Sequence, residues 1–315
     1  MSDGKAKAVR DFEATVTALE KRRKSKIFII VHTTSPHHLC NPELWTTIEN
    51  RNQFKGTDTI EILVHSPGGH ANIAYKIARF LRGRSTRLNA LVPLQAKSAT
   101  TLLCLGADSI VMGELAELGP LDVQLGDELE KGKAYFSPLN EFKSMEYLRD
   151  YATEFLDFFS FLLFNRGMSI KQALHEAIPA VTGIMGPLYS HVDPSKLGSY
   201  KRALSEGEEY AKRLLGAVGN PRAKEIVSEL VWNYPVHDFV IDREEAKQLG
   251  LPIQKMEPNE ETLLLKVVTG LMEHELPYIG FIPKRNEQKQ KGKSKVEEPA
   301  ELPSPTQRTV GASAH

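Results

Sequence analysis

Four short apolar runs, mostly of aliphatic and β-branched residues, divide the first part of the chain. They cover residues 27–31, 60–65, 88–94 and 109–112. Runs of this length without a polar alternation are typical of strands that are buried on both faces of a parallel sheet. Segments with helical spacing lie between them, at residues 71–81, at residues 98–105 and from Asn41-Pro42 onward. Strands and helices that alternate at this spacing predict a parallel sheet with right-handed crossovers.

The flanking segments follow the helical period. Residues 1–24 predict an amphipathic helix, and residues 139–186 predict a helical region with a break at Gly167. Further helices are expected at residues 205–218, 221–231, 244–250 and 260–273. We interpret the aromatic stretch Phe155–Phe164 as core or subunit interface. After residue 283 the sequence consists largely of Lys, Glu, Gln, Pro, Ser and Thr, which predicts a disordered tail.

These patterns predict four parts. Residues 1–25 form an N-terminal helix, residues 26–137 an α/β core, residues 138–283 a helical extension that completes the fold, and residues 284–315 the tail. The fold class expected is α/β, with an added α-helical region.

Composition excludes several classes of function. The 315 residues contain 40 Lys and Arg and 40 Asp and Glu, so a formal net charge of zero gives no reason to expect nucleic-acid or anionic-membrane binding. The two cysteines form neither a disulfide framework nor a zinc pattern, and we expect no metal site. We find no signal peptide and no apolar run long enough to span a bilayer, which predicts an intracellular, cytoplasmic protein.

A glycine turn is the first candidate for chemistry. The second strand runs directly into Ser66-Pro67-Gly68-Gly69, and a helix follows. Glycines allow the backbone to approach a reacting oxygen closely, and the amides at a helix N-terminus carry partial positive charge. Such a turn can stabilise an oxyanion. A tight strand-to-helix turn without any catalytic role would have the same sequence.

A serine after the third strand is the second candidate. Ser98 begins an apolar helix, where its hydroxyl would lie at the edge of the sheet at which open α/β folds keep their sites. A simple helix N-cap is the alternative interpretation. Ser98 follows Gly69 by one strand–helix–strand crossover, so both loops are expected at the same edge of adjacent strands. This pairing favours a nucleophile that faces an oxyanion site.

At this point the sequence resembles the Clp-fold serine peptidases, which include ClpP and signal peptide peptidase A, and most closely the serine dehydrogenase proteinase family. The resemblance rests on a series of segments in order, namely Thr34-Ser35-Pro36, Val64-His65-Ser66-Pro67-Gly68-Gly69, Val92-Pro93, Ala96-Lys97-Ser98-Ala99, Leu105-Gly106-Ala107-Asp108-Ser109-Ile110-Val111-Met112, Glu117-Leu118-Gly119-Pro120-Leu121-Asp122, Leu188-Tyr189-Ser190, Val192-Asp193-Pro194, Leu197-Gly198, Tyr234-Pro235, His237 and Phe239-Val240-Ile241-Asp242. It implies a ClpP/crotonase-like superhelix of stacked strand–helix–strand units.

The resemblance also implies the roles of individual residues. Ser98 would be the nucleophile, and the amides of Gly69 and Ala99 would form the oxyanion hole, with Gly68 beside them. It further implies a homo-oligomer, a peptide or protein substrate, and no organic cofactor or metal. Where relatives usually have a small residue, this chain has Thr100-Thr101, which leaves the size of the substrate pocket open.

A serine nucleophile needs a base, and the resemblance indicates two lysines. Signal peptide peptidase A carries its lysine in a Gly-x-Tyr-Lys-x-Ala segment, a form that Gly198–Ala203 shares, so Lys201 is the leading candidate. Lys143 lies where other Clp-fold Ser-Lys peptidases place the lysine, but its amphipathic helix predicts a solvent-facing side chain. Lys97 is adjacent to the serine and is oriented wrongly for a base at a strand-to-helix turn.

A Ser-His-Asp triad is the other arrangement. His191 with Asp193, or His237 with Asp242, could supply it, although histidines near turns more often have surface or structural roles. We interpret Asp122 as a turn cap.

The sequence therefore predicts a serine peptidase that forms an acyl-enzyme on Ser98. Two alternatives stay open: a catalytically silent Clp-fold scaffold that binds peptides or proteins, and crotonase-type chemistry on acyl-CoA, against which the context of Ser98 argues.

Overall fold

Six strands form the central sheet of the computed structural model, which describes residues 3–33, 38–54, 59–126 and 135–283. Their order in space is β10-β1-β2-β3-β5-β9. The bounds are β1 Lys26–Val31, β2 Thr59–His65, β3 Arg87–Val92, β5 Ser109–Met112, β9 Ile253–Lys255 and β10 Tyr278–Gly280. All neighbours are parallel except β10, which runs antiparallel to β1. Two short ladders pair β4 (Gln95–Ala96) with β6 (Glu117–Leu118) and β7 (Leu125–Gly126) with β8 (Tyr135–Phe136).

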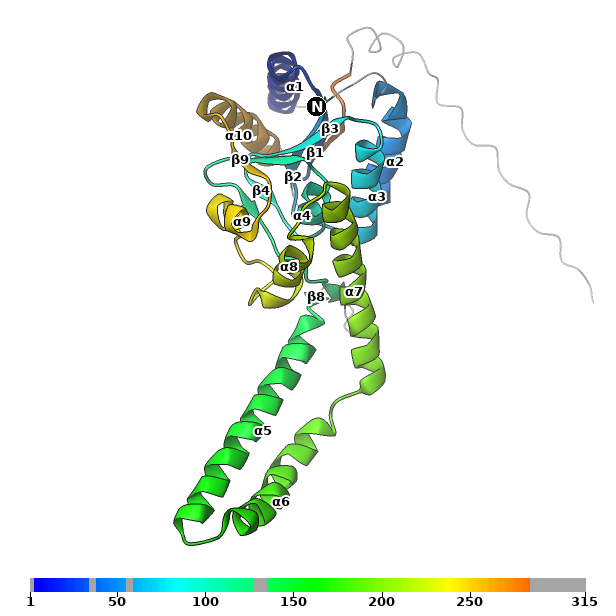
Figure 1. Ribbon diagram of the computed structural model, residues 1–315. Coiled ribbons are helices and arrows are strands. Elements are labelled where there is room, and N and C mark those ends of the chain that lie inside the picture. Colours follow the sequence, from blue (N-terminus) through cyan, green and yellow to red (C-terminus); the bar gives the residue numbers. More distant parts are fainter. Residues whose placement is uncertain (1–2, 34–37, 55–58, 127–134, 284–315) are drawn as a thin grey trace, which may run out of the picture. The chain divides into compact units, whose positions relative to one another are not determined.

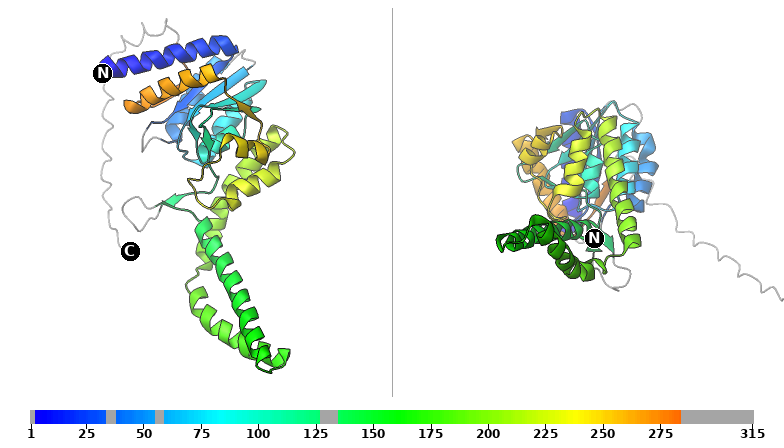
Figure 2. Two further views of the ribbon diagram at one scale, coloured as in Figure 1. Left: turned by 90° about the vertical axis from the view of Figure 1, so that its left-hand side faces the viewer. Right: turned by 60° about the horizontal axis from the view of Figure 1, so that its bottom comes forward.

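Helices cover both faces of the sheet (Figures 1 and 2). On one face lie α1 (Asp3–Arg23) and α10 (Pro258–Glu273), side by side, with buried apolar residues such as Phe12 and Leu271. The larger core packs the other face against α3 (Ala71–Arg82), α4 (Ala99–Cys104), α7 (Pro194–Ala217) and α8 (Ala223–Ser228). Because both faces are covered, the inner strands are buried along nearly their whole length. The predicted α/β class is confirmed.

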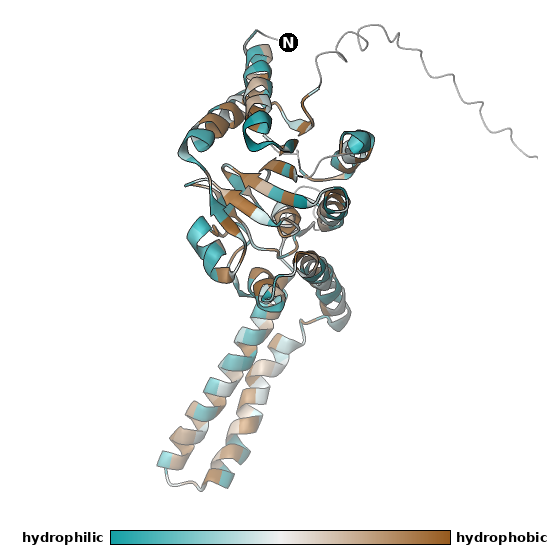
Figure 3. Cartoon of the chain, turned by 45° about the horizontal axis from the view of Figure 1, so that its top comes forward, coloured by the Kyte–Doolittle hydropathy of each residue, from teal (hydrophilic) through white to brown (hydrophobic). Residues whose placement is uncertain are grey.

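The remaining helices are α2 (Asn41–Glu49), α5 (Leu139–Asn165), α6 (Ile170–Tyr189) and α9 (Arg243–Leu249), with a 3₁₀ turn at Asn50–Phe54 and a π-helical turn at Glu229–Asn233. Helices α5 and α6 pack against each other as a hairpin that lies away from the sheet (Figures 1 and 2). Apolar residues concentrate on the strands, as expected, and also run along this hairpin (Figure 3). Within the described residues, no helix is long and apolar enough to cross a membrane.

The start of α7 and the short strands β4 and β6 to β10 differ from the sequence prediction. Helix α7 begins at Pro194 and not near residue 205, because Asp193 caps it by accepting hydrogen bonds from the amides of Ser195 and Lys196. Strands β9 and β10 were not predicted, since each is only three residues long. The chain divides by its contacts into Met1–Phe281 and Ile282–His315, and the tail predicted from residue 284 lies outside the described residues.

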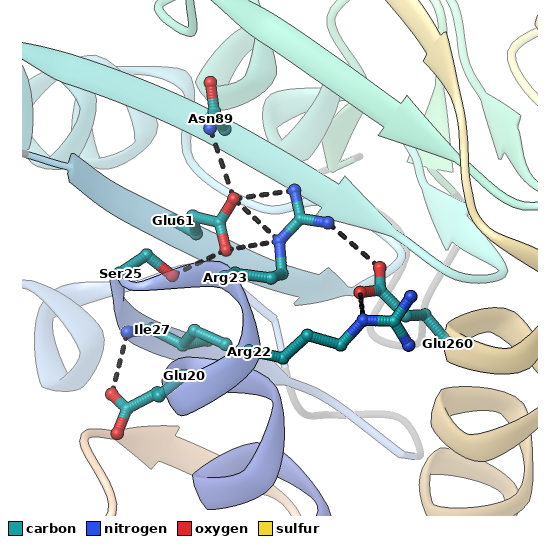
Figure 4. A network of polar contacts seen from close by, with 8 residues as sticks. All are labelled: Glu20, Arg22, Arg23, Ser25, Ile27, Glu61, Asn89 and Glu260. Carbon is teal, nitrogen blue, oxygen red and sulfur yellow. Dashed lines mark hydrogen bonds and ion pairs between the residues drawn. The ribbon is translucent and has the colours of Figure 1, made fainter.

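A buried ionic network joins the two helices of one face to the sheet (Figure 4). Arg23, at the end of α1, donates to both carboxylate oxygens of Glu61 on β2 (2.7 and 2.8 Å) and to Glu260 on α10 (2.9 Å). Ser25 and Asn89 also donate to Glu61, at 2.8 and 3.2 Å. Hydrogen bonds to Glu61 outweigh the cost of burial and raise the pKa of Arg23 above its usual range. Arg23 is the cation that the described residues place on Glu61, whereas Glu260 also pairs with Arg22 (3.2 Å).

Replacing Arg23 by alanine should be strongly destabilising. It leaves the almost completely buried carboxylate of Glu61 without its cation, while Glu260 keeps only Arg22, and such a loss costs about 3–5 kcal/mol of unfolding free energy. Urea denaturation measures this difference. The matched control is Lys21→Ala on the same helix, whose exposed side chain should change stability by less than about 0.5 kcal/mol. Equal stabilities of the two variants would contradict the role given to Arg23.

Candidate active site

The glycine turn and the serine loop meet at one edge of the sheet, as the crossover spacing predicts. Strands β2 and β3 are neighbours, and the chain beyond them stays in contact: the Ser66 amide donates to the Gln95 carbonyl (3.2 Å), and the Lys97 amide donates to the Ser66 carbonyl (3.1 Å). A Cβ atom built on Gly68 would lie only 2.8 Å from the Cβ of Ser98. Gly68 and Ser98 are therefore in direct contact, and this contact requires glycine.

Ser98 has a strained backbone. Its φ of 49° and ψ of −121° are rare for a residue with a side chain, and it is half-buried at the N-cap of α4. Gly119 lies close on the other side, since a Cβ there would be 3.3 Å from the Ser98 amide nitrogen. A serine held on a strained strand-to-helix turn is a known arrangement for an exposed nucleophile. An ordinary N-cap needs no such conformation, and the Ser98 side chain makes no capping hydrogen bond.

The amide of Gly69 is the clearest candidate for an oxyanion donor. The turn is held from outside by Leu39, whose amide donates to the Gly68 carbonyl (2.8 Å) and whose carbonyl accepts from the His70 amide (2.8 Å). This pattern leaves the Gly69 amide without an acceptor in the described part of the chain. The Gly68 amide, in contrast, donates to the Ser66 hydroxyl (3.2 Å). The Ala99 amide lies at the start of α4, beside Gly68.

Thr100 and Thr101 are completely buried and point into the core. The Thr101 hydroxyl donates to the Ala96 carbonyl (2.6 Å) and accepts from the Gly119 amide (3.0 Å). This side chain therefore ties the two loops beside Ser98 together. The sequence suggested only that it could narrow the pocket.

Lys97 is engaged in the structure of the loops. Its ammonium contacts Glu117 (3.1 Å) and donates to the carbonyls of Phe239 (3.0 Å) and Leu118 (3.4 Å). The segment around Phe239 is thereby attached to the residue next to Ser98.

That segment carries a histidine–aspartate pair. His237 Nδ1 lies 2.7 Å from a carboxylate oxygen of Asp122, which is 4% exposed, while His237 is half-buried. Burial lowers the pKa of His237, but the hydrogen bond and charge of Asp122 outweigh it, so the pKa lies above the usual value. The sequence suggested Asp242 as the partner of His237 and a turn cap for Asp122. Asp242 instead caps α9 by accepting from the Glu245 amide (2.8 Å).

The other basic candidates are exposed. Lys201 is an exposed residue in the first half of α7, and its ammonium is 4.2 Å from the centre of the Trp232 ring. Lys143 lies on α5, solvent-facing as expected, in an ion pair with Glu146 (3.2 Å). His191 is exposed in the turn before α7.

A buried chain of polar side chains supports the glycine turn, and sequence reasoning missed it. His32, at the end of β1, lies with Nδ1 2.9 Å from the Ser66 hydroxyl and Nε2 3.4 Å from Glu43. Glu43 also accepts from the Cys40 amide (2.7 Å). Burial alone would raise the pKa of Glu43, but hydrogen bonds from His32 and Cys40 lower it to about 2. The Ser66 hydroxyl accepts a hydrogen bond from the Gly68 amide. Its position is fixed by His32, which is in turn held by the ionised carboxylate of Glu43.

Burial shifts the pKa of two residues next to these polar side chains, His65 and Cys40. It lowers the pKa of His65 to about 4, with a smaller contribution from the charge of His32. It raises the pKa of the Cys40 thiol to about 11, as does Glu43. His65 is therefore neutral and Cys40 protonated at neutral pH. Within the described residues, no group of three or more His, Cys, Asp or Glu side chains could hold a metal ion.

The fold and this site define an α/β protein with a strained serine in contact with a glycine turn. Residues 5–131 match the family described as ClpP-like SDH-type serine proteinase. The resemblance to the serine dehydrogenase proteinase family is thereby confirmed for this segment.

Relatives of the chain include two archaeal proteins. It is 28% identical over 209 residues to uncharacterized protein MJ0137 of Methanocaldococcus jannaschii, covering 66% of this chain and 58% of that one. It is 25% identical over 225 residues to uncharacterized protein MJ1495 of the same organism, covering 71% of this chain and 61% of that one. The chain thus spans about 58–61% of the length of the curated relatives it matches.

Among solved structures, the chain is similar to the 1510-N membrane-bound stomatin-specific protease. A serine-to-alanine mutant of that protease matches with a TM-score of 0.40 and 16% identity, over 73% of this chain and 79% of the other. A lysine-to-alanine mutant of the same protease, in complex with a substrate peptide, matches with a TM-score of 0.41 and 14% sequence identity. This match covers 75% of this chain and 78% of the other.

Proposed function

We propose that this protein is a serine peptidase that cleaves peptide bonds through an acyl-enzyme on Ser98. The observation that carries the proposal is the strained Ser98 in contact with Gly68. The neighbouring Gly69 has an amide without an acceptor among the described residues. A donor placed where negative charge develops on the carbonyl oxygen stabilises the tetrahedral intermediate, and the Ala99 amide would be the second donor. The family of the segment 5–131 supports a peptide or protein substrate and, as for Clp-fold proteins generally, a homo-oligomer.

We propose His237 as the general base. Asp122 binds its Nδ1, which leaves Nε2 as the basic nitrogen, and this orientation is the one that a triad needs. The contact of Lys97 with the Phe239 carbonyl supports a position near Ser98. The predicted dyad with Lys201 is the competing assignment, and its lysine is exposed over Trp232.

The reaction would take two steps. His237 accepts the proton of the Ser98 hydroxyl as its oxygen attacks the scissile carbonyl, and then gives that proton to the leaving amine as the C–N bond breaks. A water molecule, deprotonated in the same way, hydrolyses the ester and frees Ser98. The proposal assigns no cofactor to either step.

A silent scaffold is the second candidate function. It is favoured by one observation: in the described part of the chain, no basic side chain forms a hydrogen bond with Ser98. Such bonds are often long in unliganded enzymes and shorten with substrate, so activity must decide.

Hydrolysis of an unfolded protein such as casein tests the proposed function. The wild type should release peptides, and the rate of hydrolysis by Ser98→Ala should be lower by a factor of about a thousand or more. Ser109→Ala, at a buried serine that begins β5, is the control and should stay active. Hydrolysis that persists in Ser98→Ala would contradict the nucleophile, and a wild type that binds casein without cleaving it would support the scaffold.

A further inference from the structure

A buried carboxylate on α2 is connected to the glycine turn from two sides, although the proposed chemistry assigns it no role. Glu43 lies in the first turn of α2 and is 5% exposed. One of its oxygens lies 3.4 Å from Nε2 of His32, and the other accepts a hydrogen bond from the Cys40 amide (2.7 Å). His32, which directly follows β1, is 2% exposed. Each of these two contacts leads on to the glycine turn.

Helix capping alone does not explain the placement of Glu43. The residue completes a capping box at the start of α2, in which its side chain accepts from the backbone of Cys40. This function uses one carboxylate oxygen, whereas the other oxygen faces His32. A buried histidine–carboxylate pair loses its hydration, and apolar side chains of similar volume are often as stabilising. The pair therefore favours a role in addition to stability.

The inner connection passes through the side chain of Ser66. This completely buried hydroxyl lies 2.9 Å from His32 Nδ1 and accepts from the Gly68 amide (3.2 Å). A neutral imidazole with its proton on Nε2 accepts the Ser66 hydroxyl at Nδ1. A charged imidazolium donates to the hydroxyl oxygen, and the hydroxyl then lies 3.4 Å from the Gly68 carbonyl as its acceptor. Both protonation states hold the Ser66 oxygen beside Gly68.

The outer connection passes through the backbone that precedes α2. Because a peptide unit is planar and trans, its C=O and N–H groups point in opposite directions. Glu43 binds the N–H of the peptide that joins Leu39 to Cys40, and the carbonyl of the same peptide accepts from the His70 amide (2.8 Å). The Leu39 amide in turn donates to the Gly68 carbonyl (2.8 Å). The same carboxylate therefore holds the outer side of the turn.

The two connections fix the direction of the Gly69 amide. This amide belongs to the same peptide as the Gly68 carbonyl, so it points away from Leu39. Gly68 and Gly69 have φ values of 122° and 141°, and glycines allow the peptide between them to rotate at small steric cost. A rotated peptide would present a carbonyl oxygen in place of the donor. The proposed oxyanion site therefore needs a turn that is held in one orientation.

Ser66 also connects the turn to the loop of the proposed nucleophile. Its amide donates to the Gln95 carbonyl (3.2 Å), and its carbonyl accepts from the Lys97 amide (3.1 Å), next to Ser98. One residue thus sets the glycine turn and the serine loop relative to each other. A displacement of about 1 Å between reacting groups can lower a rate by about 100-fold, so this placement affects catalysis directly.

We propose that Glu43 is a positioning residue of the oxyanion site. Its carboxylate acts through His32 and Ser66 on one side of the turn, and through the backbone amide before α2 on the other. Both actions direct the Gly69 amide toward the negative charge that develops on the substrate carbonyl. The inference rests on the proposed peptidase function. It places the effect of Glu43 on the chemical step and not on substrate binding.

Steady-state kinetics of peptide hydrolysis tests the positioning. Ser66→Ala and Glu43→Ala should each lower kcat by about 10–100-fold and change KM little, because a displaced donor is missed mainly in the transition state. Glu43→Gln keeps groups that can bond to His32 and to the Cys40 amide, so it should recover most of the lost rate. The matched control is Leu81→Ala.

This control separates positioning from general destabilisation. Leu81 is completely buried near the C-terminal end of α3, whereas the glycine turn precedes the other end of that helix. Its truncation leaves a cavity in the core and lowers stability. Its kcat should nevertheless equal that of the wild type. Circular dichroism checks that each variant is folded, and Ser66→Ala carries the test where Glu43→Ala does not fold.

Nuclear magnetic resonance observes the amide itself and needs no activity. Gly68-Gly69 is the only pair of adjacent glycines in the sequence, so glycine labelled with carbonyl ¹³C and with ¹⁵N isolates the Gly69 amide signal. The wild type should show a single resonance. In Ser66→Ala and Glu43→Ala this resonance should shift and broaden or double, because the peptide samples a second orientation. Leu81→Ala should leave it unchanged.

The two measurements separate the positioning role from the function on which it rests. A wild type that hydrolyses no peptide contradicts the proposed function, and the Gly69 resonance then decides the positioning by itself. Three results would overturn the positioning role: an unchanged Gly69 resonance in both folded alanine variants of Ser66 and Glu43, an unchanged kcat in both, or an equal loss of kcat in Leu81→Ala.

Discussion

His237→Gln is expected to lower kcat for peptide hydrolysis by about 10²–10⁴-fold, the usual contribution of a general base. KM should change little, because the ring acts on the proton of Ser98 and not on substrate binding. Lys201→Met should keep activity within a few-fold of wild type. Steady-state kinetics on one peptide substrate measures all three proteins. The opposite outcome, with Lys201→Met inactive and His237→Gln active, would establish the lysine dyad in place of the proposed base.

The pH dependence of kcat gives a second test of the same pair. A general base must be neutral, so activity should rise with pH through the pKa of His237, which lies above its usual value. Asp122→Asn removes the charge that raises this pKa, while burial, which lowers it, remains. The rising limb should therefore move to lower pH in the variant. A limb that stays in place would mean that His237 does not control the rate.

Gly69→Ala should cause the largest loss of stability among single substitutions at the site. A Cβ there would lie 2.3 Å from the Leu39 carbonyl oxygen and 2.5 Å from the Leu39 nitrogen, and both are backbone atoms that cannot move aside independently. The φ of 141° is also unfavourable for alanine. Overpacking and backbone strain together should cost roughly 2–6 kcal/mol of unfolding free energy, measured by urea denaturation.

Gly216→Ala is the matched control for this substitution. It lies in α7 with open space around its Cβ position, so alanine should stabilise the helix by about 0.5–1 kcal/mol. If Gly69→Ala is folded and fully active, the close packing of the glycine turn on Leu39 cannot be required for the oxyanion site.

Much of the fold follows from local patterns in the sequence. Short, mainly apolar runs identified β1, β2, β3 and β5, because a strand covered on both faces is mostly apolar; Glu61 on β2 and Asn89 on β3 are buried polar exceptions. Strand β10 was missed because Tyr278–Gly280 is only three residues long and its strand conformation depends on pairing with β1. The start of α7 was missed because Gly198 and Ser199 favour a turn locally, whereas the Asp193 cap and packing of Tyr200 and Leu204 favour helix.

The site could be predicted only where chain neighbours define it. Ser98 and the glycine turn are each a short motif, and one crossover brings them together. The partnership of His237 with Asp122 joins residues 115 positions apart, and that of His32 with Ser66 spans two strands. No local pattern signals such pairs, since their side chains meet only after the sheet has formed. Thr101 was interpreted by its size, although its buried hydroxyl is what holds Ala96 and Gly119 together.

Covalent labelling by a fluorophosphonate tests the nucleophile most directly, because this reagent reacts with activated serines and needs no knowledge of the substrate. The account predicts that the wild type gains one label, that mass spectrometry of its peptides locates it on Ser98, and that folded Ser98→Ala gains none. Labelling of both proteins alike, or of a folded wild type on any other serine, would contradict the central claim.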